Sequence, residues 1–384
     1  MASERVADWA RSGVVALTGY PDGPPLVPPG NAATLANRLG SGLAEVTGGL
    51  DGAALLGERA AFTGHRRNGA ISPGGAARLL PTADGWAAVS CARPDDPGLL
   101  GALVGAELGD DPWPGVAGWL REHSGAELAG RAALLGLAAA PVERRIGAAE
   151  WAAEPRSVAG LLVVDFSALW AGPLCAQLLG LAGARVVKVE TPWRLDGARL
   201  GNSGFYRLLH AGHRSVVIDP HTAAGRVALG KLVARADIVI EASRPRALAR
   251  FGLDAAAEVA RGAVWVSLTA AGRDSARVGF GDDVAAGAGL VAWVDGRPVF
   301  CGDAIADPLT GLVAASLALS APDGQGWLCD VAMDRVAGST LGVTDDDGAG
   351  HPVALPRHRP VRGDAPGPGE HTGEVLRELG IPLP

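Results

Sequence analysis

A chain of 384 residues with 48% hydrophobic and 20% charged residues has globular composition and is long enough for two domains. Its net charge of −7 offers no electrostatic basis for nucleic-acid binding, and no run reaches the roughly 20 apolar residues of a membrane-spanning helix. The four cysteines stand far apart without a CxxC pair, which argues against a zinc site and a dense disulfide framework.

The first 150 residues combine helical and extended patterns. Residues 1–13 contain acidic groups and no long apolar stretch, so we expect no signal peptide and a cytoplasmic protein. Apolar residues at helical spacing cover 33–46 and 125–137, and an extended run lies around 78–92. Asp84-Gly85 within that run fits a tight hairpin turn. These patterns predict a small α+β domain over residues 1–150.

A regular alternation of strands and helices begins near residue 160. Short β-branched runs that are apolar throughout are typical of buried parallel strands, and amphipathic stretches between them predict helices. The expected strands cover 161–167, 184–190, 213–220, 237–243 and 263–270. This order predicts an α/β fold with an open, doubly wound (Rossmann-like) parallel sheet over residues 158–342. Residues 343–384 are expected to form a linker, rich in Gly, Pro and charge, and a C-terminal helix.

A dinucleotide site is the first function to test in such a fold. The chain after the first expected strand reads ALWAGPLCAQLLG, which contains no GxGxxG turn. Glu190 at the end of the second strand resembles the acid that binds a ribose hydroxyl, but it stands without the glycine turn. A phosphate-binding P-loop is also absent from the sequence. The sequence therefore disfavours NAD binding.

Six stretches point to a more specific relationship. They are VVDFSALWAGPLCAQLLGLAGARVVKVETP (163–192), HRSVVID (213–219), ADIVIEASRPRALARFGL (236–253), IADPLTGLVAASLAL (305–319), GQGWLCDVAMD (324–334) and APGPGEHTGEVLRELGI (365–381). In their order along the chain they resemble the family III (CaiB/BaiF) CoA-transferases. The resemblance implies a Rossmann-like domain that uses coenzyme A thioesters as substrates and holds no permanently bound cofactor or metal.

The resemblance implies that Asp307 in IADPLTG is the catalytic nucleophile. A carboxylate can attack a thioester because the carbonyl is activated and thiolate leaves readily. The product is an aspartyl anhydride, which returning CoA converts to an aspartyl-CoA thioester. Asp before Pro at the start of an apolar helix is also an ordinary N-cap, and this second interpretation stays open.

The resemblance also implies a set of CoA-binding residues. They are Trp170, Ala171, Ile218, His221, Ser243, Arg244 and Arg250, together with Gly74 and Gly75 in a glycine loop that covers the active aspartate. Alternative interpretations remain for two of them: Trp170 as a core residue and Arg250 as a solvated cation at a helix end. Thr191 stands where some family members place an arginine that contacts a phosphate. Two interpretations of Arg244 and Arg246 stay open: they replace that contact, or they belong only to a surface turn.

The order of segments departs from the family's order. The small domain of family members precedes the C-terminal signature, whereas here ISPGGAARLLPTADGWAAVSCARPDD (71–96) resembles it near the front. We therefore expect a rearranged member with the small domain first. The resemblance implies a homodimer, and the changed order leaves open whether its chains interlock as in the family.

We expect an acyl-CoA:carboxylate CoA-transferase whose partners are an acyl-CoA and a carboxylic acid acceptor, without nucleic acid or membrane. One alternative is an acyl-CoA racemase or lyase with Asp307 as base. Racemases of the family use a Gly-His-Asp segment, but VGFGDDVAAGAGL (278–290) lacks histidine, although Asp282 or Asp283 could carry a proton. Another alternative is a non-catalytic CoA-thioester binding protein.

Overall fold

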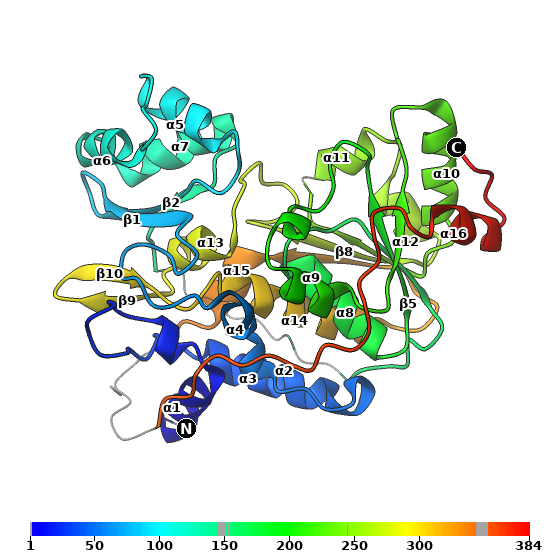
Figure 1. Cartoon of the computed structure of the whole chain (residues 1–384), viewed down its shortest axis with the longest axis horizontal. Helices are drawn as coiled ribbons and strands as arrows, with labels where there is room; N and C mark the ends of the chain where they lie inside the picture. Colours follow the sequence, from blue (N-terminus) through cyan, green and yellow to red (C-terminus); the bar gives the residue numbers. More distant parts are fainter. Residues whose placement is uncertain (1, 145–146, 148–150, 152–153, 244, 343–351) are drawn as a thin grey trace.

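A six-stranded parallel sheet forms the centre of the computed structural model, which describes residues 2–144, 147, 151, 154–243, 245–342 and 352–384. The strand order is β11-β8-β7-β4-β5-β6 (Figure 1). Their bounds are β4 (Leu162–Asp165), β5 (Arg185–Glu190), β6 (Arg214–Val217), β7 (Ile238–Glu241), β8 (Val264–Thr269) and β11 (Trp327–Ala332). The order along the chain reverses between β4 and β7, as in doubly wound nucleotide-binding folds. The predicted fold class is confirmed.

The two faces of this sheet bury different residues of each strand. Val163 contributes to a core with residues of helices α8 (Ala171–Leu181) and α14 (Ala306–Leu319). Its neighbour Val164 joins a second core with α10 (Ala223–Val233) and α16 (Thr372–Glu378). On β8, Val266 and Trp265 divide in the same way. Successive strand residues point to opposite faces. Because helices cover both faces of the sheet, its strands need apolar side chains on both faces, which gives apolar runs without alternation.

Helices connect the strands and cover the sheet. Those in the segment after β4 are α8 (Ala171–Leu181), α9 (Ser203–His210), α10 (Ala223–Val233), α11 (Pro245–Ala249), α12 (Ala255–Ala260), α13 (Gly281–Gly287), α14 (Ala306–Leu319), α15 (Met333–Ser339) and α16 (Thr372–Glu378). Two of them, α8 and α14, pack closely side by side on one face. Among the described helices, none has the length and apolar composition needed to span a bilayer.

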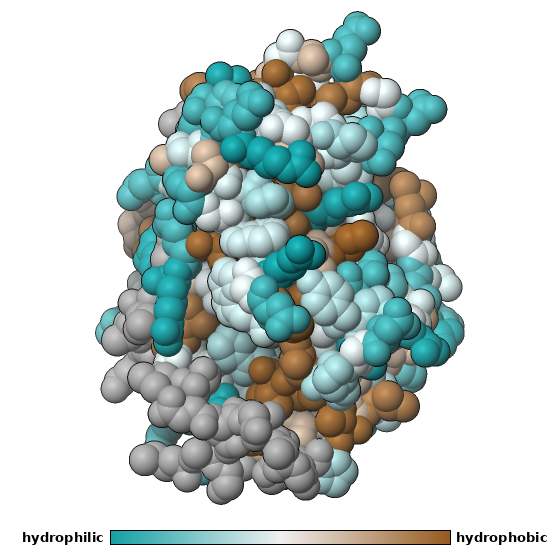
Figure 2. All heavy atoms as spheres, turned by 90° about the vertical axis from the view of Figure 1, so that its left-hand side faces the viewer, coloured by the Kyte–Doolittle hydropathy of each residue, from teal (hydrophilic) through white to brown (hydrophobic). Residues whose placement is uncertain are grey.

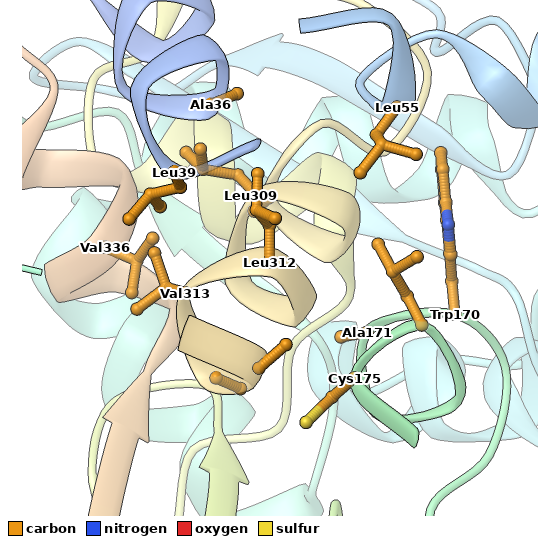
Figure 3. Packing of buried hydrophobic residues seen from close by; sticks show 14 of the residues in the cluster. Ala36, Leu39, Leu55, Trp170, Ala171, Cys175, Leu309, Leu312, Val313 and Val336 are labelled. Atoms are coloured by element: carbon orange, nitrogen blue, oxygen red, sulfur yellow. The ribbon is translucent and has the colours of Figure 1, made fainter. Parts of the chain in front are cut away.

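The N-terminal part of the chain divides between two cores. Four helices begin the chain: α1 (Ala2–Ser12), α2 (Ala32–Thr47), α3 (Gly52–Leu55) and α4 (Glu58–Thr63). Helix α2 packs on α8 and α14, α3 contacts α14, α1 packs on α2 and α3, and α4 contacts α9. Leu39 and Leu55 share the core that contains Leu309 and Leu312 of α14 (Figure 3). A separate antiparallel sheet forms a third core with α5 (Asp96–Val104), α6 (Trp113–Glu122) and α7 (Gly125–Leu135).

This small sheet consists of β1 (Ala77–Pro81), β2 (Trp86–Ser90) and β3 (Ala139–Pro141), in that order. Thr82 N–H donates to the carbonyl of Gly85 (2.9 Å), so the predicted hairpin turn is confirmed. A second hairpin, β9 (Val291–Val294) and β10 (Arg297–Phe300), lies beside it. Hydrophilic and hydrophobic residues are mixed on the molecular face that is on the left in Figure 1 (Figure 2). The predicted domain boundaries at 150 and 158 stay a prediction.

Residues 352–371, which we call the strap, cross the molecule from α1 to β6 (Figure 1). Ala354 N–H donates to the carbonyl of Ala10 (2.8 Å) at one end, and His371 N–H donates to Ser215 (2.9 Å) at the other. The strap corresponds to part of the predicted linker, and α16 to the predicted C-terminal helix. Residues 343–351 of that linker lie outside the described residues.

Candidate active site

Asp307 is the second residue of α14, and its side chain is half-buried. The helix begins at Ala306, its N-cap is Ile305, and no side chain caps it. The interpretation of Asp307 as the N-cap is therefore wrong. Its carboxyl lies in the first helical turn, where the helix dipole favours negative charge.

Gly281, the first residue of α13, lies directly against the Asp307 carboxyl. A Cβ at Gly281 would stand 2.5 Å from Asp307 Oδ2, so only glycine fits this approach. The Gly281 N–H also donates a hydrogen bond to the Asp307 carboxylate. The α13 segment therefore contacts Asp307 through its backbone. The absence of histidine from residues 278–290 does not affect this contact.

Several carboxyl groups share this region. The pKa of Asp307 is raised to about 7, mainly by burial; Arg59 and the Gly281 N–H oppose the shift, whereas Asp282 and Asp283 contribute to it. Burial likewise raises the pKa of Asp282 to about 6 and that of Asp283 to about 6. Asp307 therefore exchanges its proton near neutral pH, which suits either a nucleophile or a base.

Arg59 of α4 supplies positive charge to this group of carboxyls, and it lies 244 residues before its partner Asp303 in the sequence. Its Nε donates to Asp303 Oδ2 at 2.9 Å, its Nη2 pairs with Oδ1, and His65 Nδ1 lies 3.1 Å from Oδ2. Burial alone would raise the pKa of Asp303, but Arg59 and His65 lower it to about 2. Asp303 is therefore a fixed anion, in contrast to Asp307.

The predicted glycine loop reaches this cluster. A Cβ at Gly74 would lie 3.4 Å from His65 Cε1, 3.7 Å from Arg59 Nη2 and 3.8 Å from Asp303 Oδ1. The neighbouring Gly75 has a φ of +80°, and its N–H closes a turn on the carbonyl of Ser72 (2.8 Å). Gly74 therefore lies beside the charged cluster, and Gly75 supplies the left-handed turn.

Trp170 and Ala171 lie at the start of α8, beside the same cluster. Trp170 is 2% exposed, and the Arg59 guanidinium carbon is 5.2 Å from its ring centre. Phe205 meets the indole edge-on at 5.2 Å. Figure 3 shows Trp170 next to Leu55, at the edge of the core formed with α14. Trp170 thus belongs to the core and also borders the polar cluster.

A buried polar network fixes the loop that precedes Trp170. Lys188 Nζ pairs with Asp196 Oδ2 (2.9 Å) and donates to the carbonyl of Ser167 (2.8 Å). Asp196 Oδ1 accepts the N–H of Leu169 (3.0 Å), a residue whose φ of +70° is costly for a branched side chain. The network offsets that strain and sets the position of Trp170.

The remaining predicted CoA-binding residues lie near the carboxyl ends of β6 and β7. Ile218 is buried in the core, Ser243 follows β7, and Arg250 is exposed after α11. Arg244 lies outside the described residues. His221 contacts two rings that sequence reasoning missed, those of Trp193 and Phe251 at 4.5 Å and 6.0 Å.

A cavity of about 310 Å³ opens beside these residues. It is lined by Glu241, Leu248, Ala249, Leu253, Asp254, Ala255, Trp265 and Arg273. A second cavity of about 540 Å³ is lined by α5 and by residues 105–108, which follow it. In the part of the chain that the structure describes, no three His, Cys, Asp or Glu side chains are grouped to hold a metal ion.

The structure thus forms two groups of candidate residues. Around Asp307 lie the loop of Gly74 and the turn of Trp170, with Arg59, His65 and Asp303 added. A second group follows β6 and β7 around His221. Asp303 was within reach of sequence reasoning, because it stands one helical turn before Asp307. Arg59 and His65 carry no local signal.

Comparisons with known proteins give matches to the second half of the chain. Residues 158–345 match the model of CoA-transferase family III. Succinate–glutarate CoA-transferase of Agrobacterium fabrum is 29% identical over 211 residues, which are 48% of this chain and 52% of that protein. Succinyl-CoA–D-citramalate CoA-transferase of Chloroflexus aurantiacus is 30% identical over 197 residues, 46% and 49% of the two chains.

A crystal structure of a CAIB/BAIF family protein from Brucella suis is 28% identical, with a TM-score of 0.44, and covers 48% of this chain and 55% of that chain. The chain spans about half the length of the curated relatives it matches.

Proposed function

Residues 158–345 belong to CoA-transferase family III, and on this premise we propose that the protein is an acyl-CoA:carboxylate CoA-transferase with Asp307 as nucleophile. The observation that carries the proposal is the half-buried Asp307 carboxyl, with a pKa of about 7, at the start of α14 beside Gly281. A carboxylate whose pKa is raised is more basic and more nucleophilic than an ordinary one.

Four bond exchanges complete the reaction. An Asp307 oxygen attacks the thioester carbonyl, and CoA leaves as thiolate with the C–S electron pair, which gives a mixed anhydride. The thiolate then attacks the Asp307 carbonyl carbon and releases the donor carboxylate, which leaves an aspartyl-CoA thioester. The acceptor carboxylate displaces thiolate from that thioester, and the thiolate finally attacks the acceptor's acyl carbon. Asp307 is regenerated, and no net proton is exchanged.

The CoA molecule is proposed to lie along the carboxyl ends of β4, β6 and β7. Ligands of open α/β sheets bind where the strand order reverses, which here is between β4 and β7. The exposed imidazole of His221, held between Trp193 and Phe251, offers an aromatic surface to the base. Arg250 is exposed after α11 and within reach of a phosphate group.

The N-terminal segment is proposed to take the place of the family's small domain. This is supported by Gly74, whose backbone lies against Arg59, His65 and Asp303. A rearranged order of segments, a homodimer and a cytoplasmic location remain predictions.

A second candidate, proton exchange at the α-carbon of an acyl-CoA, is favoured by one observation. His65 pairs with Asp303 at 3.1 Å, four residues before Asp307. A histidine oriented by a buried carboxylate is a competent proton carrier. The sequence has no histidine between residues 222 and 350, so this one is visible only in the fold.

Hydroxylamine trapping separates the candidates. The protein is incubated with a panel of acyl-CoA esters and hydroxylamine, and peptides are analysed by mass. A hydroxamate on Asp307, absent in Asp307→Asn and present in the exposed control Asp323→Asn, supports the transferase. Deuterium uptake at the α-carbon without such an adduct supports proton exchange. CoA-ester binding without either signal contradicts both and leaves a binding protein.

A further inference from the structure

Two hydrogen-bond donors beside Asp307 lack an acceptor. The Nε1 of Trp170 is buried and has no partner among the described residues. Arg59 uses Nε and Nη2 for Asp303, and within the described part of the chain its Nη1 donates to no group. An unsatisfied buried N–H is unfavourable, so a ligand or water oxygen belongs at the indole.

The geometry directs Asp307 toward this pair of donors. A Cβ at Gly311 would stand 2.5 Å from the carbonyl oxygen of Ala171. Asp307 lies one turn earlier on the same helical face, and side chains lean toward the helix N-terminus. It therefore faces the chain just ahead of Ala171, where Trp170 stands. Arg59, which lies over the Trp170 ring, is close enough for its charge to act on Asp307.

We propose that Trp170 Nε1–H and Arg59 Nη1–H hold the carbonyl oxygen of the bound acyl-CoA while Asp307 attacks it. This inference rests on the proposed function and adds Arg59, from outside the family match, to the catalytic residues. As the Asp307 oxygen bonds to the acyl carbon, the C=O π electrons move onto the carbonyl oxygen. They return when the C–S bond breaks and thiolate leaves.

The charge arrangement fits a donor pair for a developing oxyanion. Asp303 neutralises Arg59, so the pair attracts a ground-state carboxylate only weakly. The two N–H groups interact most strongly when negative charge develops on the carbonyl oxygen, which is the condition for transition-state stabilisation. Ion pairing with Asp303 and contact with Trp170 hold the guanidinium in place beforehand.

The test compares two Trp→Phe variants of the full chain. Trp170→Phe removes the indole N–H but keeps an aromatic ring, and Trp293→Phe makes the same change at an exposed site on β9. Arg59→Lys keeps the positive charge for Asp303 but removes the second nitrogen. The readouts are the rate of hydroxamate formation on Asp307, the Kd of the CoA ester and the unfolding temperature.

Trp170→Phe is expected to lower the trapping rate about 10²–10³-fold with Kd unchanged. It also lowers the unfolding temperature, because the smaller ring leaves space in the core. Arg59→Lys is expected to slow trapping in the same way, and Trp293→Phe to leave the trapping rate unchanged. If wild type is trapped and Trp170→Phe matches its rate, the indole N–H binds only water and this inference is overturned while the proposed function stands. If wild type forms no Asp307 adduct, the proposed function fails and the donor pair fails with it.

Discussion

Replacing Asp307 by Asn tests the electrostatics of the site through protein stability. Burial raises the pKa of Asp307 from 3.8 to about 7. The native state then holds this proton more firmly than the unfolded state, so stability falls as pH rises from about 4 to about 7. The full shift corresponds to about 4 kcal/mol at 1.36 kcal/mol per unit. Asp307 is half-buried, so we expect solvent screening to reduce this to about 2 kcal/mol.

The assay is urea denaturation at several values between pH 4 and pH 8. Asp307→Asn should gain about 2 kcal/mol relative to wild type between the two ends of this range, because the uncharged amide no longer titrates. Asp22→Asn, at an exposed aspartate, should follow wild type throughout. Parallel profiles for wild type and Asp307→Asn would refute a raised pKa at this carboxyl. The same carboxyl predicts that kcat/KM rises with pH through about 7, since only the carboxylate attacks.

Three further substitutions test how the site is held. Gly281→Ala should destabilise by about 2 kcal/mol in urea and slow trapping, because its Cβ would displace the carboxyl beside it. Lys188→Met should cost about 3 kcal/mol in the same assay, since it leaves buried Asp196 without its cation. Arg359→Ala should cost about 3 kcal/mol because it removes both side-chain bonds to buried Glu58 and leaves only the backbone N–H of residue 359 as donor. The conservative Arg359→Lys should recover part of the loss. For each substitution, an unchanged free energy of unfolding would contradict the role assigned to that contact.

The central sheet was predictable because its strands carry their own signal. The first three residues of β4 (LVV) and of β7 (IVI) are buried on both faces of the sheet, so apolar side chains follow one another without alternation. The hairpin of β9 and β10 was not predicted, although its strands VAWV and RPVF flank an Asp295-Gly296 pair that is typical of a tight turn. Helices α1–α4 were assigned to a small domain, yet their apolar residues share a core with α8 and α14. Local periodicity reveals an apolar face but not the surface that covers it.

The candidate site was predictable only in part, for the same reason. Asp307 stands out through its resemblance to a family motif, and Gly74 through a glycine-rich loop. His65 and Arg59 were not found, because a hydrogen bond across 244 residues leaves no trace in spacing. The capping interpretation of Asp307 failed because the helix begins at Ala306, two residues earlier than an Asp307 cap with Pro308 as first helical residue would require.

The segment outside the family match completes the site electrostatically. Asp303 is 0% exposed, and Arg59 is its ion-pair partner from α4. Glu58, the preceding residue, is bound by Arg359 of the strap, and Arg359 also donates to Gln177 of α8 (2.7 Å). The α4 helix is thereby tied to the strap on one side and to Asp303 on the other. Residues 158–345 alone would keep Asp307 but leave Asp303 as a buried anion without its guanidinium, which is strongly destabilising. The matched region therefore needs α4, tied to the strap, to keep Asp303 paired.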